Sequence, residues 1–252
     1  QEPSNLDVFF LVSEFNSKLA GSRLANFYDS PIFRFKFNNG ENIVLDFGKG
    51  AFLSNKFPLA ETPSSFAMLF RKHLDNARFV CAKQLNDDRI FVLEFEKKEK
   101  FFVVLELFRE GNLLLCDSKM KIISVLHSVD YASRKLRRSQ TYVSPPAGKK
   151  SVFSLSVSDL LSLNGLLVSA LSKTVNLSPF YLEEACARAG LSYDKKALST
   201  PEAAFLLIAL KSLYEQIEPV VYESGGVPVL FSVTPLKKVA GKNFLEKPFS
   251  TL

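Results

Sequence analysis

The chain has 252 residues, of which 47% are hydrophobic and 23% are charged, a balance that is typical of globular proteins and excludes an intrinsically disordered chain. No stretch approaches the roughly 18 consecutive apolar residues that a membrane-spanning helix requires. Two acids, Asp7 and Glu14, lie where a secretory signal would be apolar. We therefore expect a cytoplasmic protein with no membrane partner.

Residues that bind metals are sparse. The three cysteines, Cys81, Cys116 and Cys186, are widely spaced, and His73 and His127 are the only histidines. They form no C-x-x-C pair and no His/Cys cluster of the kind that holds zinc. We expect free buried thiols, no metal site and no other cofactor.

The first part of the chain predicts a helix followed by β structure. Residues 5–20 carry apolar side chains at helical spacing and predict an amphipathic helix that ends at Gly21. Residues 32–37 alternate apolar and basic side chains, and together with residues 42–47 they predict a hairpin around an Asn-Asn-Gly turn.

A second helix is predicted from Thr62-Pro63 to residue 74, because threonine followed by proline is a typical helix start. Its outward face carries Arg71 and Lys72. Five β-rich runs separated by polar turns come next and predict an antiparallel meander. These runs are residues 77–85, 89–96, 101–108, 112–117 and 121–127.

The pattern changes within a basic, Ser/Pro-rich connector, residues 131–150, where we place a domain boundary. The predicted class is α+β, with an antiparallel, β-sandwich-like lobe in residues 1–145 and a helical lobe in residues 146–218. Helical spacing predicts helices over residues 158–163, 166–173, 178–190 and 200–216. A hairpin around Ser224-Gly225-Gly226 is expected in residues 219–252, with no further element after it.

Patterns that indicate an enzyme are absent from the sequence. It has no G-x-S-x-G turn, no phosphate-binding glycine loop and no recognisable pairing of a nucleophile with a base. We expect a protein without catalytic residues and without a small-molecule substrate.

The connector carries the charge imbalance of the chain. Residues 131–158 contain no acid and six cations, which equals the net charge of +6: Arg134, Lys135, Arg137, Arg138, Lys149 and Lys150. Such a run beside Tyr131 and Tyr142 fits the phosphate backbone of a nucleic acid, and it fits a solvated loop equally well. We regard the first four of these cations, together with Arg71 and Lys72, as possible RNA backbone contacts.

Polar residues open the strand predicted at 89–96. Asn86 and Asp87 are typical turn residues, and Asp88 and Arg89 can form a local ion pair. Alternatively, Arg89 presents its planar guanidinium to a phosphate or a base edge, oriented by Asp88. The residues alone leave both readings open.

Three blocks in order resemble the amino-terminal domain of the NFACT family of ribosome-associated quality-control factors. They are "LDVFFLVSEFNSKLAGSRLANFYDS", "PSSFAMLFRKHLDNARFVCAKQLNDDRI" and "ELFREGNLLLCD". Residues 170–190, "ALSKTVNLSPFYLEEACARAG", are similar to the family's helix-hairpin-helix segment, with Ser178-Pro179 where glycines are usual. The resemblance implies a shape like that of formamidopyrimidine-DNA glycosylases, with residues 219–252 beginning a middle region that is cut off before a coiled coil.

The resemblance also implies function. Family members bind the large ribosomal subunit that still carries peptidyl-tRNA, recruit tRNA (alanyl-tRNA in bacteria and archaea) and support untemplated tailing of the nascent chain. An acid in the first helix and an Asp-Arg pair at a strand start are required for tailing, and they fall on Asp7, Asp88 and Arg89. We therefore expect these three residues to meet and to handle tRNA.

There are two alternative functions. A DNA glycosylase or lyase of the same shape needs an amino-terminal proline nucleophile, whereas Pro3 follows Gln1-Glu2, and the cysteines of a zinc finger are absent. An adhesin needs a route to the cell surface that the sequence does not supply. The identity of the tRNA stays open.

Overall fold

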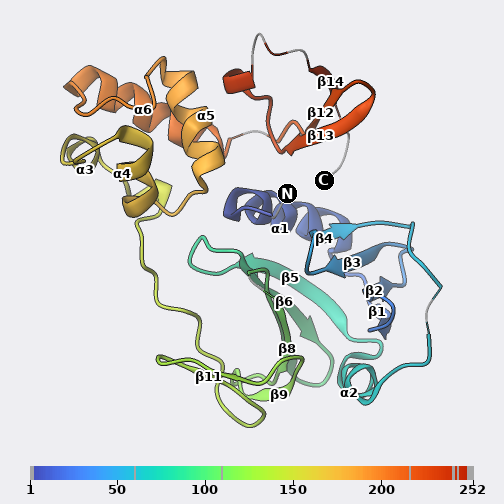
Figure 1. Ribbon diagram of the computed structural model, residues 1–252. Helices are drawn as coiled ribbons and strands as arrows, with labels where there is room; N and C mark the ends of the chain where they lie inside the picture. The colour runs from blue at the N-terminus through green and yellow to red at the C-terminus, as the bar shows by residue number, and fades with distance from the viewer. Residues whose placement is uncertain are drawn as a thin grey trace. The chain divides into compact units, whose positions relative to one another are not determined.

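The computed structural model describes residues 3–59, 61–108, 110–215, 217–239, 242 and 244–248 (Figure 1). It contains helices and antiparallel sheets, so the predicted α+β class is confirmed. The chain divides into two compact units. We call residues 11–146 the sheet unit, and we call residues 3–10 together with the described residues of 147–252 the helical unit.

The first helix, α1 (Asn5–Leu19), contributes to both units. The Ser4 amide donates to Asp7 Oδ2 over 2.6 Å, and the Asp7 amide donates to Ser4 Oγ over 3.2 Å. This reciprocal capping satisfies amides that the first helical turn leaves unpaired. The predicted helix over residues 5–20 is confirmed, and Gly21 follows it with a φ of 74°.

A four-stranded antiparallel sheet comes next, with strands β1 (Leu24–Tyr28), β2 (Phe33–Phe37), β3 (Asn42–Asp46) and β4 (Gly50–Leu53) in that order. The predicted hairpin is the pair β2–β3, whereas β1 and β4 were not predicted. Helix α2 (Ser65–Leu74) packs Phe70 on Phe27 of β1, with ring centroids 4.4 Å apart. Its cap is Ser64, so the predicted start at Thr62-Pro63 was too early.

The predicted meander is confirmed as a five-stranded antiparallel sheet. Its strands, in spatial order, are β5 (Arg78–Gln84), β6 (Ile90–Glu96), β7 (Lys100–Glu106), β8 (Asn112–Cys116) and β9 (Ile122–Val125). Phe37 of the first sheet contacts Phe79 and Phe95 of this one, which closes a core between the two sheets. Between β7 and β8, Gly111 has a φ of 71°, and a Cβ there would lie 1.9 Å from Phe47 Cδ1, so the turn requires glycine.

The first half of the connector is ordered structure of the sheet unit. Strands β10 (Val129–Asp130) and β11 (Lys135–Leu136) form a hairpin, and backbone hydrogen bonds then tie residues 139–142 to residues 120–122. Leu136 and Tyr142 are buried in the same cluster as Ile122. These residues are therefore part of a packed core instead of a linker.

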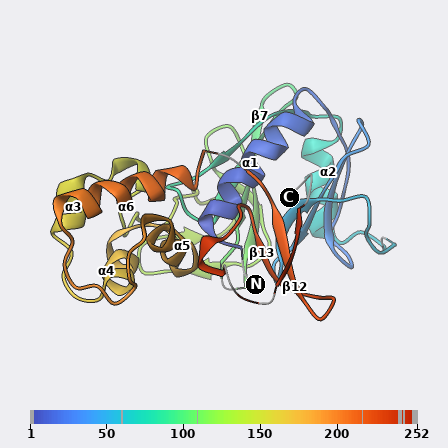
Figure 2. The same cartoon turned by 90° about the horizontal axis from the view of Figure 1, so that it is seen from above.

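The helical unit holds α3 (Val157–Leu161), α4 (Leu167–Thr174), α5 (Pro179–Ala189) and α6 (Thr200–Ser212), preceded by a short 3-10 turn, η1 (Val152–Ser154). Figure 2 shows these helices gathered in one bundle. Gly190 ends α5 in the left-handed conformation, as predicted. Helix α6 ends at Ser212, and the predicted endpoint Gln216 lies outside the described residues.

The predicted hairpin is formed by β12 (Val220–Ser224) and β13 (Val227–Ser232). Gly225 and Gly226 both have positive φ, as a two-residue hairpin turn requires. A turn, η2 (Lys237–Val239), follows, and β14 (Leu245–Pro248) pairs with the free edge of β12. The expectation of no further element after the hairpin is therefore wrong.

Candidate nucleic-acid interface

The turn between β5 and β6 brings Asp88 and Arg89 to the edge of the five-stranded sheet. Asn86 and Asp87 have φ values of 54° and 50°, and the Asp88 amide donates to the Leu85 carbonyl over 2.9 Å. Two successive positive φ angles define a type I′ turn, which asparagine and aspartate tolerate better than most residues. The expected turn chemistry is thus present.

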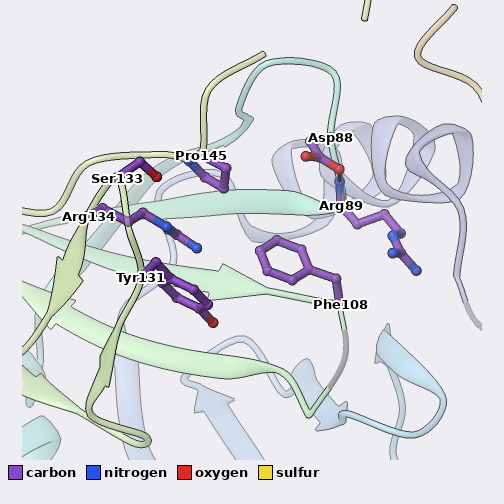
Figure 3. Close-up of a pocket in the computed structure, with 7 residues that line it drawn as sticks. All are labelled: Asp88, Arg89, Phe108, Tyr131, Ser133, Arg134 and Pro145. Carbon is purple, nitrogen blue, oxygen red and sulfur yellow. Dashed lines mark hydrogen bonds between the residues drawn. The ribbon is translucent and has the colours of Figure 1, made fainter. Parts of the chain in front are cut away.

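Asp88 and Arg89 do not face one another. The Asp88 carboxylate accepts the Arg89 amide over 2.7 Å, and Gln84 Nε2 donates to the Asp88 carbonyl over 2.8 Å. Figure 3 shows the Asp88 carboxylate and the Arg89 side chain pointing in opposite directions. Asp88 therefore fixes the backbone at the strand start and leaves the guanidinium to point elsewhere.

The turn borders an open pocket of about 360 Å³ in the sheet unit (Figure 3). Segments far apart in the sequence line it, and they include Asp88 and Arg89 of the turn, Phe108 after β7, and Tyr131, Arg134 and Pro145 of the connector. Asn86 Nδ2 donates to Ser144 Oγ over 3.1 Å and to the Pro145 carbonyl over 3.3 Å. The turn and the connector are therefore held together as one surface.

Arg134 anchors this surface from inside. Its guanidinium makes a two-pronged contact with the Glu106 carboxylate, in which Nη2 lies 2.9 Å from Oε2, and Nη1 also donates to the Val143 carbonyl. The Tyr142 hydroxyl donates to Glu106 Oε1 over 2.9 Å, and burial beside this carboxylate raises the pKa of Tyr142. The Arg134 side chain is only 4% exposed. We therefore withdraw Arg134 from the possible RNA contacts.

The other cations of the connector differ in availability. Lys135 and Arg138 are exposed. Arg137 is exposed too, but Asp130, just before the acid-free stretch, binds its Nε over 2.6 Å. Lys150 likewise pairs with Asp159, just after the stretch, over 2.5 Å. The free positive charge of the connector is thus smaller than the count of its residues suggests.

Arg71 and Lys72 lie on α2, beside the four-stranded sheet. Arg71 is half-buried, and its Nε donates to the Phe27 carbonyl over 2.8 Å while its guanidinium lies 5.3 Å from the Tyr28 ring. Lys72 is exposed. Both stay possible RNA contacts.

Asp7 is positioned by the helical unit. Its Oδ1 accepts the Tyr181 hydroxyl over 2.9 Å, and that hydroxyl also accepts the Val233 amide over 3.2 Å. Burial raises the pKa of Asp7, while hydrogen bonds from Ser4 and Tyr181 lower it. Asp7 thus joins α1 to α5 and the end of β13. Its meeting with Asp88 and Arg89, which belong to the sheet unit, stays a prediction.

We expect Tyr181→Phe to destabilise the protein by about 1–3 kcal/mol near pH 7, because Val233 loses its acceptor and Asp7 loses a donor. The folded-state pKa of Asp7 lies above its ordinary value of 3.8, so its carboxylate costs stability as the pH rises through that folded-state pKa. Losing the hydroxyl raises this pKa further. The deficit of the variant should therefore shrink as the pH falls through the raised folded-state pKa of Asp7, and its Asp7 share should be lost near the ordinary value of 3.8.

Urea unfolding near pH 7 and near the ordinary pKa of Asp7, 3.8, measures how the stability deficit of Tyr181→Phe depends on pH. Tyr193→Phe is the matched control, because Tyr193 is exposed and lies in the same unit. A deficit that does not change with pH would show that Asp7 gains nothing from the Tyr181 hydroxyl.

The sequence analysis missed the buried hydrogen bonds of Glu106, Tyr142 and Tyr181. Each bonds to a partner that lies 28 or more positions away in the sequence. No local pattern reports such a pairing. Among the described residues, no group of three or more potential metal ligands comes together, and no helix is long and apolar enough to cross a membrane.

Comparison with known proteins identifies the family of this chain. The family model described as "NFACT N-terminal and middle domains" matches residues 5–252. The chain therefore belongs to the NFACT family.

Curated relatives come from several lineages. The chain is 31% identical over 165 residues to the archaeal Rqc2 homolog aRqcH of Methanocaldococcus jannaschii, a match that covers 62% of this chain and 25% of that protein. It is 38% identical over 133 residues to the ribosome quality control complex subunit 2 of Saccharomyces cerevisiae, which covers 50% and 13%. The match to the human ribosome quality control complex subunit NEMF is 32% over 130 residues, covering 49% and 12%. These matches span a quarter or less of each relative.

Solved structures share the fold. The fibrinogen binding protein from Staphylococcus aureus superposes with a TM-score of 0.78 at 17% identity, covering 98% of this chain and 94% of that one. The amino-terminal part of the fibronectin/fibrinogen-binding protein from Streptococcus suis gives 0.74 at 18%, covering 92% and 90%. At this level of identity the likeness concerns the fold alone.

Proposed function

We propose that this chain is the RNA-handling part of a ribosome quality-control factor. In this role it binds tRNA, alanyl-tRNA in a bacterial or archaeal setting, and the large ribosomal subunit that carries peptidyl-tRNA. It thereby supports untemplated tailing of the stalled nascent chain in the cytoplasm. Peptide bonds form on the ribosome, so the chain positions its partners and catalyses no reaction. The names of the curated relatives support the quality-control role.

The observation that carries the proposal is the surface built by the β5–β6 turn and the connector. Asp88 fixes the strand start, so that Arg89 projects from a rigid edge beside a pocket that Tyr131 also lines. A guanidinium suits phosphate, and an aromatic ring suits a base. Lys135 and Arg138 are exposed on the same connector and add charge for the RNA backbone.

A second contact is proposed in the helical unit. Residues 175–178 join α4 to α5 in the manner of a helix-hairpin-helix, and the amino terminus of α5 favours an anionic partner. Proline at position 179 removes one amide from that end. We therefore expect this contact to be weaker than the one at Arg89.

The test is the full-length protein carrying Arg89→Ala or Asp88→Ala. Loss of a charge-assisted contact is worth about 1.5–3 kcal/mol, so we expect tRNA affinity to fall roughly ten- to a hundredfold for Arg89→Ala. Tailing of stalled chains on split large subunits should fall with it. Asp88→Ala should weaken both through a misplaced Arg89.

The matched control is Asp117→Ala/Lys119→Ala. Asp117 caps the β8–β9 turn of the same sheet by accepting the Lys119 and Lys121 amides. The double substitution therefore disturbs a comparable turn that is distant in sequence from Arg89. Full tailing by the control and reduced tailing by the Arg89 variant support the proposal. Unchanged tRNA binding and tailing by a folded Arg89→Ala protein would remove the role assigned to this edge.

A further inference from the structure

A second cationic site lies on the four-stranded sheet, built around Arg34 of β2. This side chain is only 8% exposed. The centroids of the Tyr28 and Phe57 rings each lie 3.9 Å from its Cζ atom. Two rings at that distance fit only on opposite faces of a guanidinium, so Arg34 is stacked between them.

No carboxylate neutralises this arginine among the residues that the structure describes. Its one hydrogen bond within the described part of the chain is a long contact of 3.5 Å from Nη1 to Asn42 Oδ1. Acids near it in the sequence have other donors, since Asp29 accepts from Ser64 and Glu61 accepts from Ser30. A buried cation without a counter-ion is costly, and stacking on two rings offsets only part of that cost.

The edge of the Arg34 guanidinium is open to a ligand, whereas both of its faces are covered by rings. None of its nitrogen atoms is both fully enclosed and without a partner, so the N–H groups that make no bond within the chain reach the surface. With both faces covered, the ligand has to approach in the plane of the fork, which is the geometry that binds phosphate or carboxylate oxygens. The rings also hold the fork in place before a ligand arrives.

A second arginine lies at the Tyr28 ring, and a lysine lies on the same strand as Arg34. The Arg71 guanidinium lies 5.3 Å from Tyr28, and the Phe27 carbonyl fixes its direction. Lys36, two residues after Arg34 on the strand, projects to the same face and is exposed. A repeating anion satisfies several such cations together, which favours a phosphate backbone over a single carboxylate.

A purely structural role for Arg34 explains these observations less well. Phe57 belongs to the segment after β4, so stacking on Arg34 could serve to hold that segment against the sheet. An apolar side chain at position 34 would do so without burying a charge. The open edge and the surrounding cations have no part in such a clamp.

We propose that Arg34, stacked between Tyr28 and Phe57, binds a backbone phosphate of RNA. The site is separate from the Arg89 surface, and it rests on the proposed RNA-binding function for its ligand. It gives the sheet unit a second, sequence-independent contact, in which Arg34 supplies the fork and Arg71 and Lys36 supply neighbouring charge.

The experiment measures binding of labelled tRNA to the full-length protein as a function of salt. Arg34→Gln should lower the magnitude of the salt slope by about 0.7–0.9, the share of one phosphate, and reduce affinity roughly three- to tenfold at moderate salt. Arg78→Gln is the matched control, because this exposed arginine of the same unit is already paired with Glu96. It should leave the slope unchanged.

A second measurement separates binding from folding. In the unaltered protein with arginines labelled for NMR, the Arg34 side-chain signal should move saturably on addition of inorganic phosphate and of tRNA, and not with chloride at equal ionic strength. Arg34→Lys keeps the charge but loses the planar fork of the guanidinium. The salt slope of this variant should therefore lie between that of the Arg34→Gln protein and that of the unaltered protein.

The outcomes are distinct. A silent Arg34 signal, or a folded Arg34→Gln protein with an unchanged slope, overturns the proposal. Movement with polyglutamate and not with tRNA overturns it in favour of an acidic protein partner. Arg89→Ala is measured in parallel, so normal tRNA binding by that variant together with a reduced slope for Arg34→Gln would refute the Arg89 surface and support this site.

Discussion

Replacing Arg134 with methionine is expected to lower the free energy of unfolding by about 3–5 kcal/mol. The change removes both prongs of the contact with Glu106, whose side chain is only 1% exposed, and leaves that carboxylate buried without its counter-ion. The Val143 carbonyl loses a donor as well. Urea unfolding followed by circular dichroism measures the loss, because the chain has no tryptophan.

Two controls give this result its meaning. Arg138→Met removes an exposed cation of the same connector and should change stability by less than about 0.5 kcal/mol. Glu106→Leu/Arg134→Met removes both charges and should recover much of the loss, although Tyr142 then lacks its acceptor. A stable Arg134→Met protein with weakened RNA binding would instead make Arg134 a direct contact.

Replacing Glu184 with alanine should destabilise the helical unit by about 3–5 kcal/mol. The Glu184 side chain is fully buried in α5 and accepts three donors: Arg188 Nε over 2.8 Å, the Lys237 amide over 2.9 Å and the Lys238 amide over 3.0 Å. Without the carboxylate, two backbone amides lose their acceptor, and the Arg188 guanidinium loses its charged partner. Hydrogen exchange should report faster exchange of the Lys237 and Lys238 amides.

Glu183→Ala is the adjacent control. Its carboxylate is 41% exposed and pairs with Lys238 Nζ over 3.1 Å, so its loss should cost no more than about 1 kcal/mol. If both variants lost the same stability, the effect would come from helix charge and not from the buried acceptor. Unchanged exchange at Lys237 in the Glu184 variant would contradict the anchoring role.

The elements predicted correctly are those whose own residues carry a strong periodic signal. The five runs of the meander alternate or are continuously apolar between polar turns, and Gly225-Gly226 permits positive φ angles. Strands β1, β4 and β14 were missed because they lie at the edges of their sheets, where the partner strand defines them more than their own pattern. The start of α2 was misplaced because Ser64 gains a second partner, Asp29, from a distant segment.

The candidate site was predictable only where its chemistry is local. Asn86 and Asp87 indicated a turn, and the turn is there. The count of cations in the connector gave no indication that Arg134 pairs with Glu106 or that Arg137 pairs with Asp130. Arg34 was hidden in the same way, because its alternation with phenylalanines predicted a hairpin strand and gave no sign that Phe57 covers it.

The anchoring of η2 by Glu184 also bears on which substitutions the protein tolerates. Glu184 accepts the backbone amide of Lys237, while the side chain of that lysine is exposed. Any amino acid that retains a backbone hydrogen can make the same bond, so only proline is forbidden there. Most substitutions at this position should therefore leave the bond intact, whereas in α5 only glutamate supplies two accepting oxygens at that reach.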